Sequence, residues 1–395
     1  MSLDPLLELD DLPPARELRS SARAFLTVAV TLEVDTRIIR GAECQNISET
    51  GMYVVTNVRI PEGTRGVVTL TKKCADRNYT FTADFVARRQ QVDSNGSFGI
   101  GVQFTRLYDD DRRNLSIIIE YHLAVSMREM IRTDEEGMEG IVFRIARTRE
   151  DLAAAFRLVH DTYVHEGYMD PDPSGMRFSI HHSLPFSTTF LAEKDGEVVI
   201  TTTLFLDSPI GLPADALYKV ELDDLRREGR LVAEIGSFAA AAHCRNLGLK
   251  AALHIQKLLF LYTFEYLSVD DTIITIHPRH RDYYKYILLF EQIGIEKVYH
   301  RVKGSPAIAM HLNLRTIKSR LQKAYAGNAL DRNLFEFIYL RKSPCLEMPD
   351  KKAPVIVWDR DLFTYFFQVK TSLAAKTDPA TIVSILETYT TVKEE

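Results

Sequence analysis

Alternating apolar and polar positions mark residues 24–105 as β-structure. Short runs of β-branched and aromatic residues are separated by glycine or asparagine, as at Gly41, Gly51 and Asn57. Several short strands at this spacing predict a small β-barrel or sandwich. Aspartates at 109–111, followed by apolar residues at helical spacing, predict a helix after the last strand. The expected strands are Leu26–Val34, Met52–Val55, Val67–Leu70, Tyr79–Ala87 and Phe98–Phe104.

The pattern changes after the polar, glycine-bearing stretch Arg132–Gly140. From there strands alternate with helices, and Thr148–Asp151 has the composition of a capping box that opens a helix. Asp195-Gly196, between two apolar runs, predicts a hairpin because both residues of such a turn need positive φ. Arg245–Leu267 reads as a mostly apolar, buried helix. The other expected elements are strands at Val142–Ala146, Phe190–Ala192, Val198–Phe205, Leu231–Ala239, Thr272–Ile276, Ile295–His300 and Ala307–Leu312, and a helix at Arg279–Ile293.

These patterns divide the chain into five parts. We expect a flexible acidic lead at residues 1–18, a β domain at 19–131, a linker at 132–140, an α+β domain at 141–315 and a helical extension at 316–395. A length of 395 residues also favours two main domains.

Composition excludes several classes of protein. An apolar fraction of 46% and a charged fraction of 26% are ordinary for a globular protein and exclude a wholly disordered, collagenous or coiled-coil chain. A net charge of −5 offers no global positive excess for a nucleic-acid partner. No export signal and no apolar stretch of spanning length is visible, so we expect a cytoplasmic location. The four cysteines, which form no CxxC motif and fit a reducing compartment, are Cys44, Cys74, Cys244 and Cys345.

Two arginines and a polar turn form the first candidate site. Arg19 and Arg23 stand before the first strand, where two guanidinium groups can wrap an anion. Asn46 and Ser48 offer short polar groups at a strand edge, and Gly51 permits a close backbone approach or a positive φ. Solvated surface charges beside an ordinary turn are the alternative interpretation.

The two motifs together, RxxxR followed by NxSxxG, resemble the PilZ domain over about residues 16–130. This resemblance implies a six-stranded β-barrel with a trailing helix that binds cyclic di-GMP. Arg19 and Arg23 would hold its phosphates and stack on guanine, while the asparagine, serine and glycine of the second motif would contact a guanine edge. Leu18 stands where many such motifs carry another arginine, which leaves affinity and stoichiometry open.

A glutamate-bearing strand followed by a glycine-containing helix start forms the second candidate site. Val232–Phe238 carries Glu234, and Arg245–Lys250 opens the long helix. Free N–H groups at a helix N-terminus, together with its dipole, make an anion site. The order of elements and this loop resemble the GNAT superfamily of N-acyltransferases, in which the loop cradles a phosphate of a pantetheine-type donor. The resemblance implies donor contacts from Gly236, Ser237, Phe238, Arg245, Gly248 and Lys250.

Further stretches resemble the FeeM-like N-acyl amino acid synthases, cousins of the acyl-homoserine-lactone synthases, over about residues 141–315. The resemblance implies an α+β domain that transfers a fatty acyl chain from an acyl carrier protein to the amine of an amino acid. Lys250, in place of a small residue, suggests a donor with one phosphate rather than the pyrophosphate of coenzyme A. The stretches that carry this resemblance are Phe156–Tyr168, the Glu234 strand, His277–His280, Tyr283–Gly294 and Gly304–Ile308.

The reaction needs a proton acceptor beside an already activated thioester, and Glu234 and His243 are the candidates. Either side chain can take the proton of the attacking amine, directly or through water, and backbone N–H groups of a splayed strand can hold the developing oxyanion. Glu234 lies mid-strand, where the matching motif has its glutamate, and His243 precedes the phosphate loop. A buried glutamate paired with a basic neighbour is the alternative. Tyr163 and Tyr168 either shape the pocket or belong to the core.

No metal is expected, because His181-His182 and His277-x-x-His280 match no recognised ligand set. An acyl carrier protein is acidic, so its docking surface should be basic. Scattered solvated charges are the alternative to such a surface. The candidates for it are Lys250, Lys257, Arg279, Arg281 and Lys285.

The leading hypothesis is therefore an N-acyl amino acid synthase regulated by cyclic di-GMP, acting through residues 132–140 or through a contact between domains. A non-enzymatic cyclic di-GMP effector, whose acyltransferase-like domain binds a lipid or protein partner, is the alternative. A coenzyme A-dependent acetyltransferase is a third reading. In the extension, Arg332–Arg341 and Leu362–Lys370 have amphipathic patterns that suit packing on the body, capping an acyl tunnel or forming a dimer surface.

Overall fold

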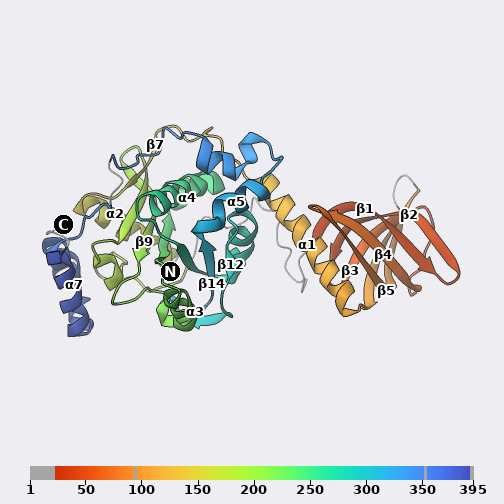
Figure 1. The fold of residues 1–395 in the computed structure, drawn as a ribbon, viewed down its shortest axis with the longest axis horizontal. Helices are drawn as coiled ribbons and strands as arrows, with labels where there is room; N and C mark the ends of the chain where they lie inside the picture. Colours follow the sequence, from red (N-terminus) through yellow and green to blue (C-terminus); the bar gives the residue numbers. More distant parts are fainter. Residues whose placement is uncertain (1–22, 93–95, 351–353, 392–395) are drawn as a thin grey trace. The chain divides into compact units, whose positions relative to one another are not determined.

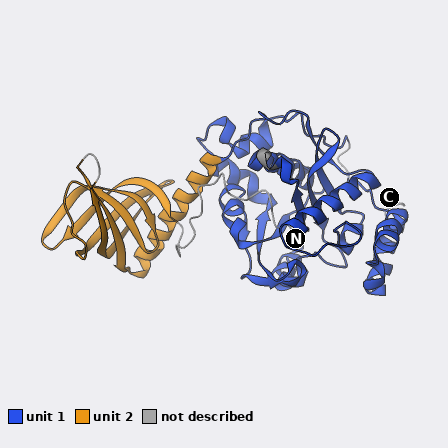
Figure 2. Cartoon of the chain, turned by 180° about the vertical axis from the view of Figure 1, so that it is seen from behind, with its two compact units in different colours: residues 1–11, 131–395 blue, residues 12–130 orange. Residues whose placement is uncertain are grey.

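A computed structural model describes residues 23–92, 96–350 and 354–391, except the side chains of 245–247 and 391. Within these ranges the chain forms two compact units, and the boundary between them in the sequence lies between Met130 and Ile131 (Figure 2). Each unit has its own hydrophobic core, and each is described below by itself.

The first unit is a six-stranded antiparallel barrel closed in the order β1-β2-β3-β6-β5-β4 (Figure 1). Alternate side chains of each strand point inward, so that Leu32, Val54 and Phe81 are fully buried. The trailing helix α1 covers this core with Leu115 and Ile118. The elements are β1 (Ala24–Val34), β2 (Arg37–Ser48), β3 (Gly51–Thr56), β4 (Arg65–Cys74), β5 (Arg77–Val92), β6 (Phe98–Arg106) and α1 (Asp109–Met130).

The expected barrel and helix are confirmed, with two differences in the strands. The strand β2 was not predicted because its outward positions carry Arg37, Arg40 and Glu43, which hide the apolar alternation. The strand β5 does not end at Ala87 but continues to Val92, as a ladder of pairs with β6 shows.

The second unit is built on one mixed sheet with strand order β12-β14-β11-β10-β9-β8-β7 and helices against it. The expected α+β class is confirmed. The strands are β7 (Ile141–Ile145), β8 (Thr188–Lys194), β9 (Glu197–Leu206), β10 (Val232–Ala240), β11 (Asp271–Ile276), β12 (Glu291–Gln292), β13 (Lys297–Tyr299) and β14 (Ser305–Asn313). The α-helices of this unit are α2 (Arg149–His165), α3 (Asp215–Arg227), α4 (Gly248–Glu265), α5 (Leu314–Ala324), α6 (Arg360–Phe363) and α7 (Pro379–Thr391).

Two local predictions are confirmed in this unit. The side chain of Thr148 accepts a hydrogen bond from the Asp151 N–H and forms the capping box that opens α2. Asp195 and Gly196 both have positive φ, as the tight turn between β8 and β9 requires.

The helix predicted at Arg279–Ile293 is wrong. The chain instead makes a 3₁₀ turn at Pro278–His280 and a π turn at Tyr283–Ile287. Leu289 then adopts a left-handed conformation, and β12 pairs with β14. A left-handed residue ends any α-helix, so the apolar run around it fills the core as irregular chain.

The strands β10 and β11 run parallel and part midway. They pair from Val232↔Asp271 to Ile235↔Ile274. Beyond that point β10 follows β9, whereas β11 follows β14. A bulge between Gly236 and Ala239, with Ser237 at φ 51°, marks the place where β10 turns away.

The extension after α5 wraps back onto the sheet of the second unit. Phe363 and Phe366 pack with Trp358 against Phe156 of α2. Nearer the start of the extension, a segment adds to β7, because the Phe143 N–H donates to the Cys345 carbonyl at 2.7 Å. Among the described residues, no helix combines the length and the apolarity needed to span a bilayer.

Candidate functional site

The first unit carries a surface pocket of about 320 Å³ at the predicted arginine motif. Arg23 lines it, and its Nη1 donates to the Asn46 Oδ1 at 2.9 Å, so the two motif halves meet as expected. Arg19 lies outside the described residues. The pocket is lined by Arg23, Thr50, Gly51, Met52, Tyr53, Arg88, Arg89, Gly101, Val102 and Gln103.

Gly51 lines this pocket, whereas Ser48 and Asn46 stand beside its lining residues. The buried Ser48 hydroxyl donates to the Gly51 carbonyl at 3.2 Å and so braces the turn between β2 and β3. A Cβ on Gly51 would stand 2.3 Å from the Val102 carbonyl oxygen, so only glycine allows β3 and β6 to approach here. The close backbone approach, rather than a positive φ, is the reason for this glycine.

Two further arginines line the pocket and belong to neither motif. Arg88 and Arg89 stand on β5, and the Arg88 Nε donates to the Gln103 Oε1 at 2.7 Å. The signal was present as consecutive arginines, but the strand was expected to end at Ala87. Three guanidinium groups around one pocket make a strong anion site.

Glu234 is the buried acid of the second unit. It lies on β10 with 1% of its surface exposed. Its Oε2 accepts the Ala214 N–H at 2.6 Å, while Oε1 has no partner among the described residues. Burial raises the pKa of this carboxyl to about 7. A carboxylate half-ionised near neutral pH, with one oxygen free, is suited to accept a proton.

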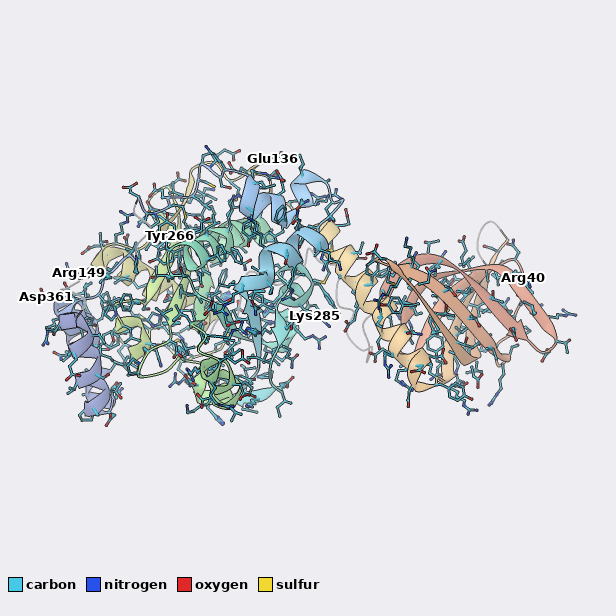
Figure 3. The ribbon with its side chains drawn as sticks, in the orientation of Figure 1. Arg40, Glu136, Arg149, Tyr266, Lys285 and Asp361 are labelled. Carbon is cyan, nitrogen blue, oxygen red and sulfur yellow. The ribbon has the colours of Figure 1, made fainter. Side chains whose placement is uncertain are left out.

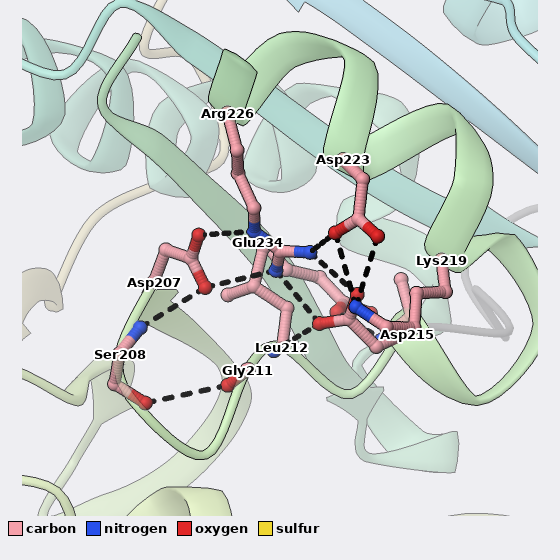
Figure 4. A network of polar contacts seen from close by, with 10 residues as sticks. Asp207, Ser208, Gly211, Leu212, Asp215, Lys219, Asp223, Arg226 and Glu234 are labelled. Atoms are coloured by element: carbon pink, nitrogen blue, oxygen red, sulfur yellow. Dashed lines mark hydrogen bonds and ion pairs between the residues drawn. The ribbon is translucent and has the colours of Figure 1, made fainter. Parts of the chain in front are cut away.

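An ion cluster on α3 holds the backbone that binds Glu234 (Figure 4). The Arg226 guanidinium donates to Asp207 at 2.6 Å and to Asp215 at 2.7 Å. Asp215 in turn accepts the Leu212 N–H, and hydrogen bonding to Arg226 holds its pKa below the usual range although burial opposes this. The 207–215 loop is thereby fixed at both ends, and the Ala214 N–H points at Glu234.

The second unit also has a cleft of about 500 Å³. Pro213, which directly precedes the partner of Glu234, lines the cleft, but Glu234 itself does not. The cleft and Glu234 are therefore connected through the Pro213–Ala214 peptide, whose N–H is bound by the Glu234 carboxylate. The cleft is lined by Tyr163, Arg177, Phe178, Ser179, Ile180, His181, His182, Phe205, Pro213, Ser237, Tyr299, Arg301, Leu373, Lys376 and Thr377.

His182 and Ser237 form a hydrogen-bonded pair in the cleft wall. The Ser179 N–H donates to the His182 Nδ1 at 3.0 Å, so Nε2 carries the proton and faces the Ser237 hydroxyl at 3.3 Å. Burial lowers the pKa of His182 to about 3 and that of His181 to about 4, so both rings are neutral. In the sequence these histidines stand out only as candidate metal ligands, and no local pattern indicates their place in the cleft.

His243 lies away from Glu234. Its side chain is 60% exposed, and its Nε2 pairs with Glu197 at 3.6 Å, at the start of β9. Glu234 pairs with Phe205 at the other end of β9, so the structure does not bring the two catalytic candidates together.

The predicted donor-binding residues lie in four different places. The Gly236 carbonyl accepts the Thr202 hydroxyl at the bulge, Ser237 faces the cleft, and Phe238 lines an apolar cavity under α4. Gly248 begins α4 with φ 53°. Arg245 lies on the preceding 3₁₀ turn, and its side chain is outside the described residues.

Lys250 is held on the first turn of α4. Its ammonium donates to Asp134 at 2.5 Å and to the Glu136 carbonyl at 2.8 Å. Hydrogen bonding to Lys250 lowers the pKa of Asp134. The segment expected as a linker is thus tied to the predicted phosphate-binding turn.

Lys257 was expected on a basic docking surface, but it is buried. Lys257 is 2% exposed, and its ammonium donates to the Arg341 carbonyl and the Ser343 hydroxyl, so it is not part of any surface. Burial lowers its pKa to about 8. A lysine on an apolar helix is buried here because the extension supplies it with acceptors, which the local pattern does not reveal.

Family models match both units of the chain. Residues 154–313 match the model described as N-acyl amino acid synthase FeeM, and residues 17–120 match the PilZ domain. Both predicted resemblances are confirmed, and so is the class of enzyme, an acyltransferase.

The chain is also similar to parts of several solved structures. FeeM, an N-acyl amino acid synthase from uncultured soil microbes, is 30% identical over 45% of this chain and 94% of its own, with a TM-score of 0.41. The coenzyme A-dependent acyl-homoserine lactone synthase BjaI is 14% identical over 46% and 89%, with a TM-score of 0.36. The PilZ domain of YcgR from Escherichia coli, solved with cyclic di-GMP, is 17% identical over 28% and 95%, with a TM-score of 0.23. No curated protein matches the chain.

Proposed function

Because this chain belongs to the FeeM family of N-acyl amino acid synthases and carries a PilZ domain, we propose that it joins a fatty acyl chain to the amine of an amino acid under the control of cyclic di-GMP. The observation that carries the catalytic part is the buried Glu234, whose second carboxylate oxygen has no partner in the part of the chain that the structure describes. The acyl donor is an acyl carrier protein, and the reaction takes place in the cytoplasm.

The proposed chemistry transfers the acyl group in one displacement. The neutral amine attacks the thioester carbonyl, the C–N bond forms, and the C–S bond breaks as the sulfur leaves as the pantetheine thiolate. Glu234 does not itself line the cleft, so it accepts the proton that the amine loses by way of a water molecule. It then returns this proton to the departing sulfur, which is released as the thiol. Backbone N–H groups where β10 parts from β11 stabilise the oxyanion.

The apolar cavity under α4 suits the acyl chain. Its lining includes Ile235 and Phe238 of β10 at one side and Leu334 and Ile338 of the extension at another. Its walls are almost wholly apolar, which favours a hydrocarbon chain over a short polar acyl group. Its volume of about 60 Å³ has room for only part of such a chain.

The cleft has the charges that an amino acid carboxylate requires. Arg177 and Arg301 both line it, and the Arg177 Nη2 is bound to the Arg301 carbonyl at 3.2 Å. We expect Arg301→Gln to raise the KM for the amino acid about 10- to 100-fold, since a charge-assisted hydrogen bond is lost, with a small effect on the KM for the donor. Steady-state kinetics with each substrate varied measures this split. Lys303→Gln, which removes a nearby cation outside the cleft, is the matched control, and an equal rise in both variants would contradict the assignment.

Regulation is proposed to act through residues 132–140. This segment follows α1 directly in the chain, and its Asp134 and Glu136 hold Lys250 on the first turn of α4. A change at the end of α1 when the nucleotide binds would alter these contacts, and with them the turn proposed to bind the donor phosphate.

A product assay tests the proposed function. Purified full-length protein is incubated with long-chain acyl carrier protein and all twenty amino acids, and the lipids are read by mass spectrometry. A new N-acyl amino acid supports the proposal. If no product forms while cyclic di-GMP still binds, the chain acts instead as a non-enzymatic effector.

A further inference from the structure

Three residues from distant parts of the second unit bring metal-ligand atoms together beside α4. Glu135 precedes β7, His254 lies on α4, and Cys345 lies on the extension. One potential ligand atom of each lies within 4.8 Å of the other two. No ligand set was apparent in the sequence because the three positions are far apart along the chain.

His254 is prepared to accept a metal ion. Its side chain is 0% exposed, and its Nδ1 donates to the Lys250 carbonyl at 2.8 Å. That bond leaves Nε2 with its lone pair, and Nε2 has no partner among the described residues. Stacking on Phe143 and an edge contact with Phe337 fix the plane of the ring. A histidine whose other nitrogen donates to a backbone carbonyl is the usual arrangement of a metal ligand.

The other two groups suit a cation of the zinc class. The Cys345 thiol and the Glu135 carboxylate make only a long contact of 3.9 Å with each other, so neither is fully satisfied by the other. Sulfur, imidazole nitrogen and carboxylate oxygen are the ligand types that Zn²⁺ takes. A metal-free cluster would leave a buried imidazole nitrogen without a partner, which is costly.

We propose that Glu135, His254 and Cys345 bind one divalent cation of the zinc class, which fastens the 132–140 segment and the extension to α4. This departs from the expectation that the chain binds no metal. On binding, the Cys345 thiol loses its proton to solvent as the metal–sulfur bond forms. The fourth position of a tetrahedral ion is left to water. The three protein ligands come from three separate segments, so the ion would link those segments.

The proposed metal site lies where other contacts already hold the 132–140 segment and the extension against α4. Lys250 holds Asp134 and the Glu136 carbonyl, and Lys257 holds the Arg341 carbonyl. Just after α4, the Tyr266 hydroxyl donates to the Pro349 carbonyl and so also holds the extension (Figure 3). The two segments are also joined directly, since the Arg341 Nη1 donates to the Thr133 carbonyl at 2.8 Å, and the cation would add to this bond.

Metal binding to the full-length chain tests the proposal. The protein is stripped with a chelator and titrated with Zn²⁺ against a competing indicator, and separately with Co²⁺. We expect one equivalent of Zn²⁺, a thiolate-to-cobalt absorption band, and a higher Tm with zinc than without it. Cys345→Ser should abolish the band and weaken zinc binding roughly tenfold or more. Glu135→Gln, at a half-exposed position, should weaken zinc binding by a similar factor but keep the band.

Cys244→Ser, which removes a buried cysteine outside the cluster, is the matched control and should bind zinc like the wild type. The proposal is overturned if the stripped wild type takes up no zinc at equimolar concentration. It is also overturned if Cys345→Ser keeps the cobalt band and the affinity of the control.

Discussion

Replacement of Glu234 by glutamine is expected to lower the rate of acyl transfer by about 10²- to 10⁴-fold, the contribution of a positioned general base. Glutamine keeps the shape of the side chain and an oxygen that can accept the Ala214 N–H, so the loop at 207–215 keeps its support. The variant should therefore fold and bind the donor, while the proton of the amine has no acceptor. Single-turnover formation of the N-acyl amino acid measures the loss.

The pH dependence gives the base a second signature. The pKa of Glu234 is raised to about 7, and a base acts only when deprotonated, so the wild-type rate should rise as pH increases through about 7. This limb should be missing from the residual activity of Glu234→Gln. Stability moves in the opposite sense, because a folded-state pKa above the unfolded value favours the protonated protein. That stabilisation is complete below the unfolded pKa of about 4.5 and is lost as pH rises through about 7.

Glu221→Gln is the control for both measurements. Glu221 is a partly buried carboxylate on α3 that pairs with Lys297 at 3.5 Å, outside the cleft. It should keep the rate and the pH profile of the wild type. A Glu234→Gln variant that retains full activity would show that Glu234 is a buried structural acid and not the base.

Arg23→Ala is expected to weaken cyclic di-GMP binding about 10- to 100-fold, the equivalent of about 1.5–3 kcal/mol for a hydrogen bond to a charged group. Arg23 lines the pocket and is placed by Asn46, so its guanidinium is available for a phosphate at little cost in side-chain entropy. Isothermal titration calorimetry at fixed salt measures the Kd. Salt matters because contacts between exposed charges are screened.

Arg40→Ala is the matched control for Arg23→Ala. Arg40 is an exposed arginine of the same barrel, on β2, and does not line the pocket (Figure 3). Its removal should leave the Kd unchanged. Equal affinities of wild type and Arg23→Ala would contradict the site, whereas equal losses in both variants would point to a general charge effect.

The barrel and the hairpin of the second unit were predictable because the signals are local. Alternation along β1 and β6 is strong, and the Asp195-Gly196 turn requires a conformation that few residue pairs adopt. The strand β2 was not predictable in the same way, since arginines on its outward face obscure the pattern. The Arg279–Ile293 stretch failed because tertiary packing, with a left-handed Leu289, overrode its helical spacing.

The site residues that belong to short local motifs were predictable, and those brought together only by the fold were not. Glu234 and Arg23 belong to short motifs and were found from the sequence. His181, His182 and Arg301 were not found as cleft residues, because α2, the turn before β8 and the turn after β13 meet only in the fold. Lys257 looked like a surface charge until the extension was seen to bury it. Contacts made across long sequence separations leave no periodic trace.

The rate of N-acyl amino acid formation across a titration of cyclic di-GMP tests the central claim most directly. The account predicts that the wild-type rate changes with nucleotide, with a midpoint at the calorimetric Kd, and that Arg23→Ala shifts this midpoint to higher concentration without changing the rate in the absence of nucleotide. A wild-type rate that is the same with no nucleotide and with saturating, bound nucleotide would contradict it.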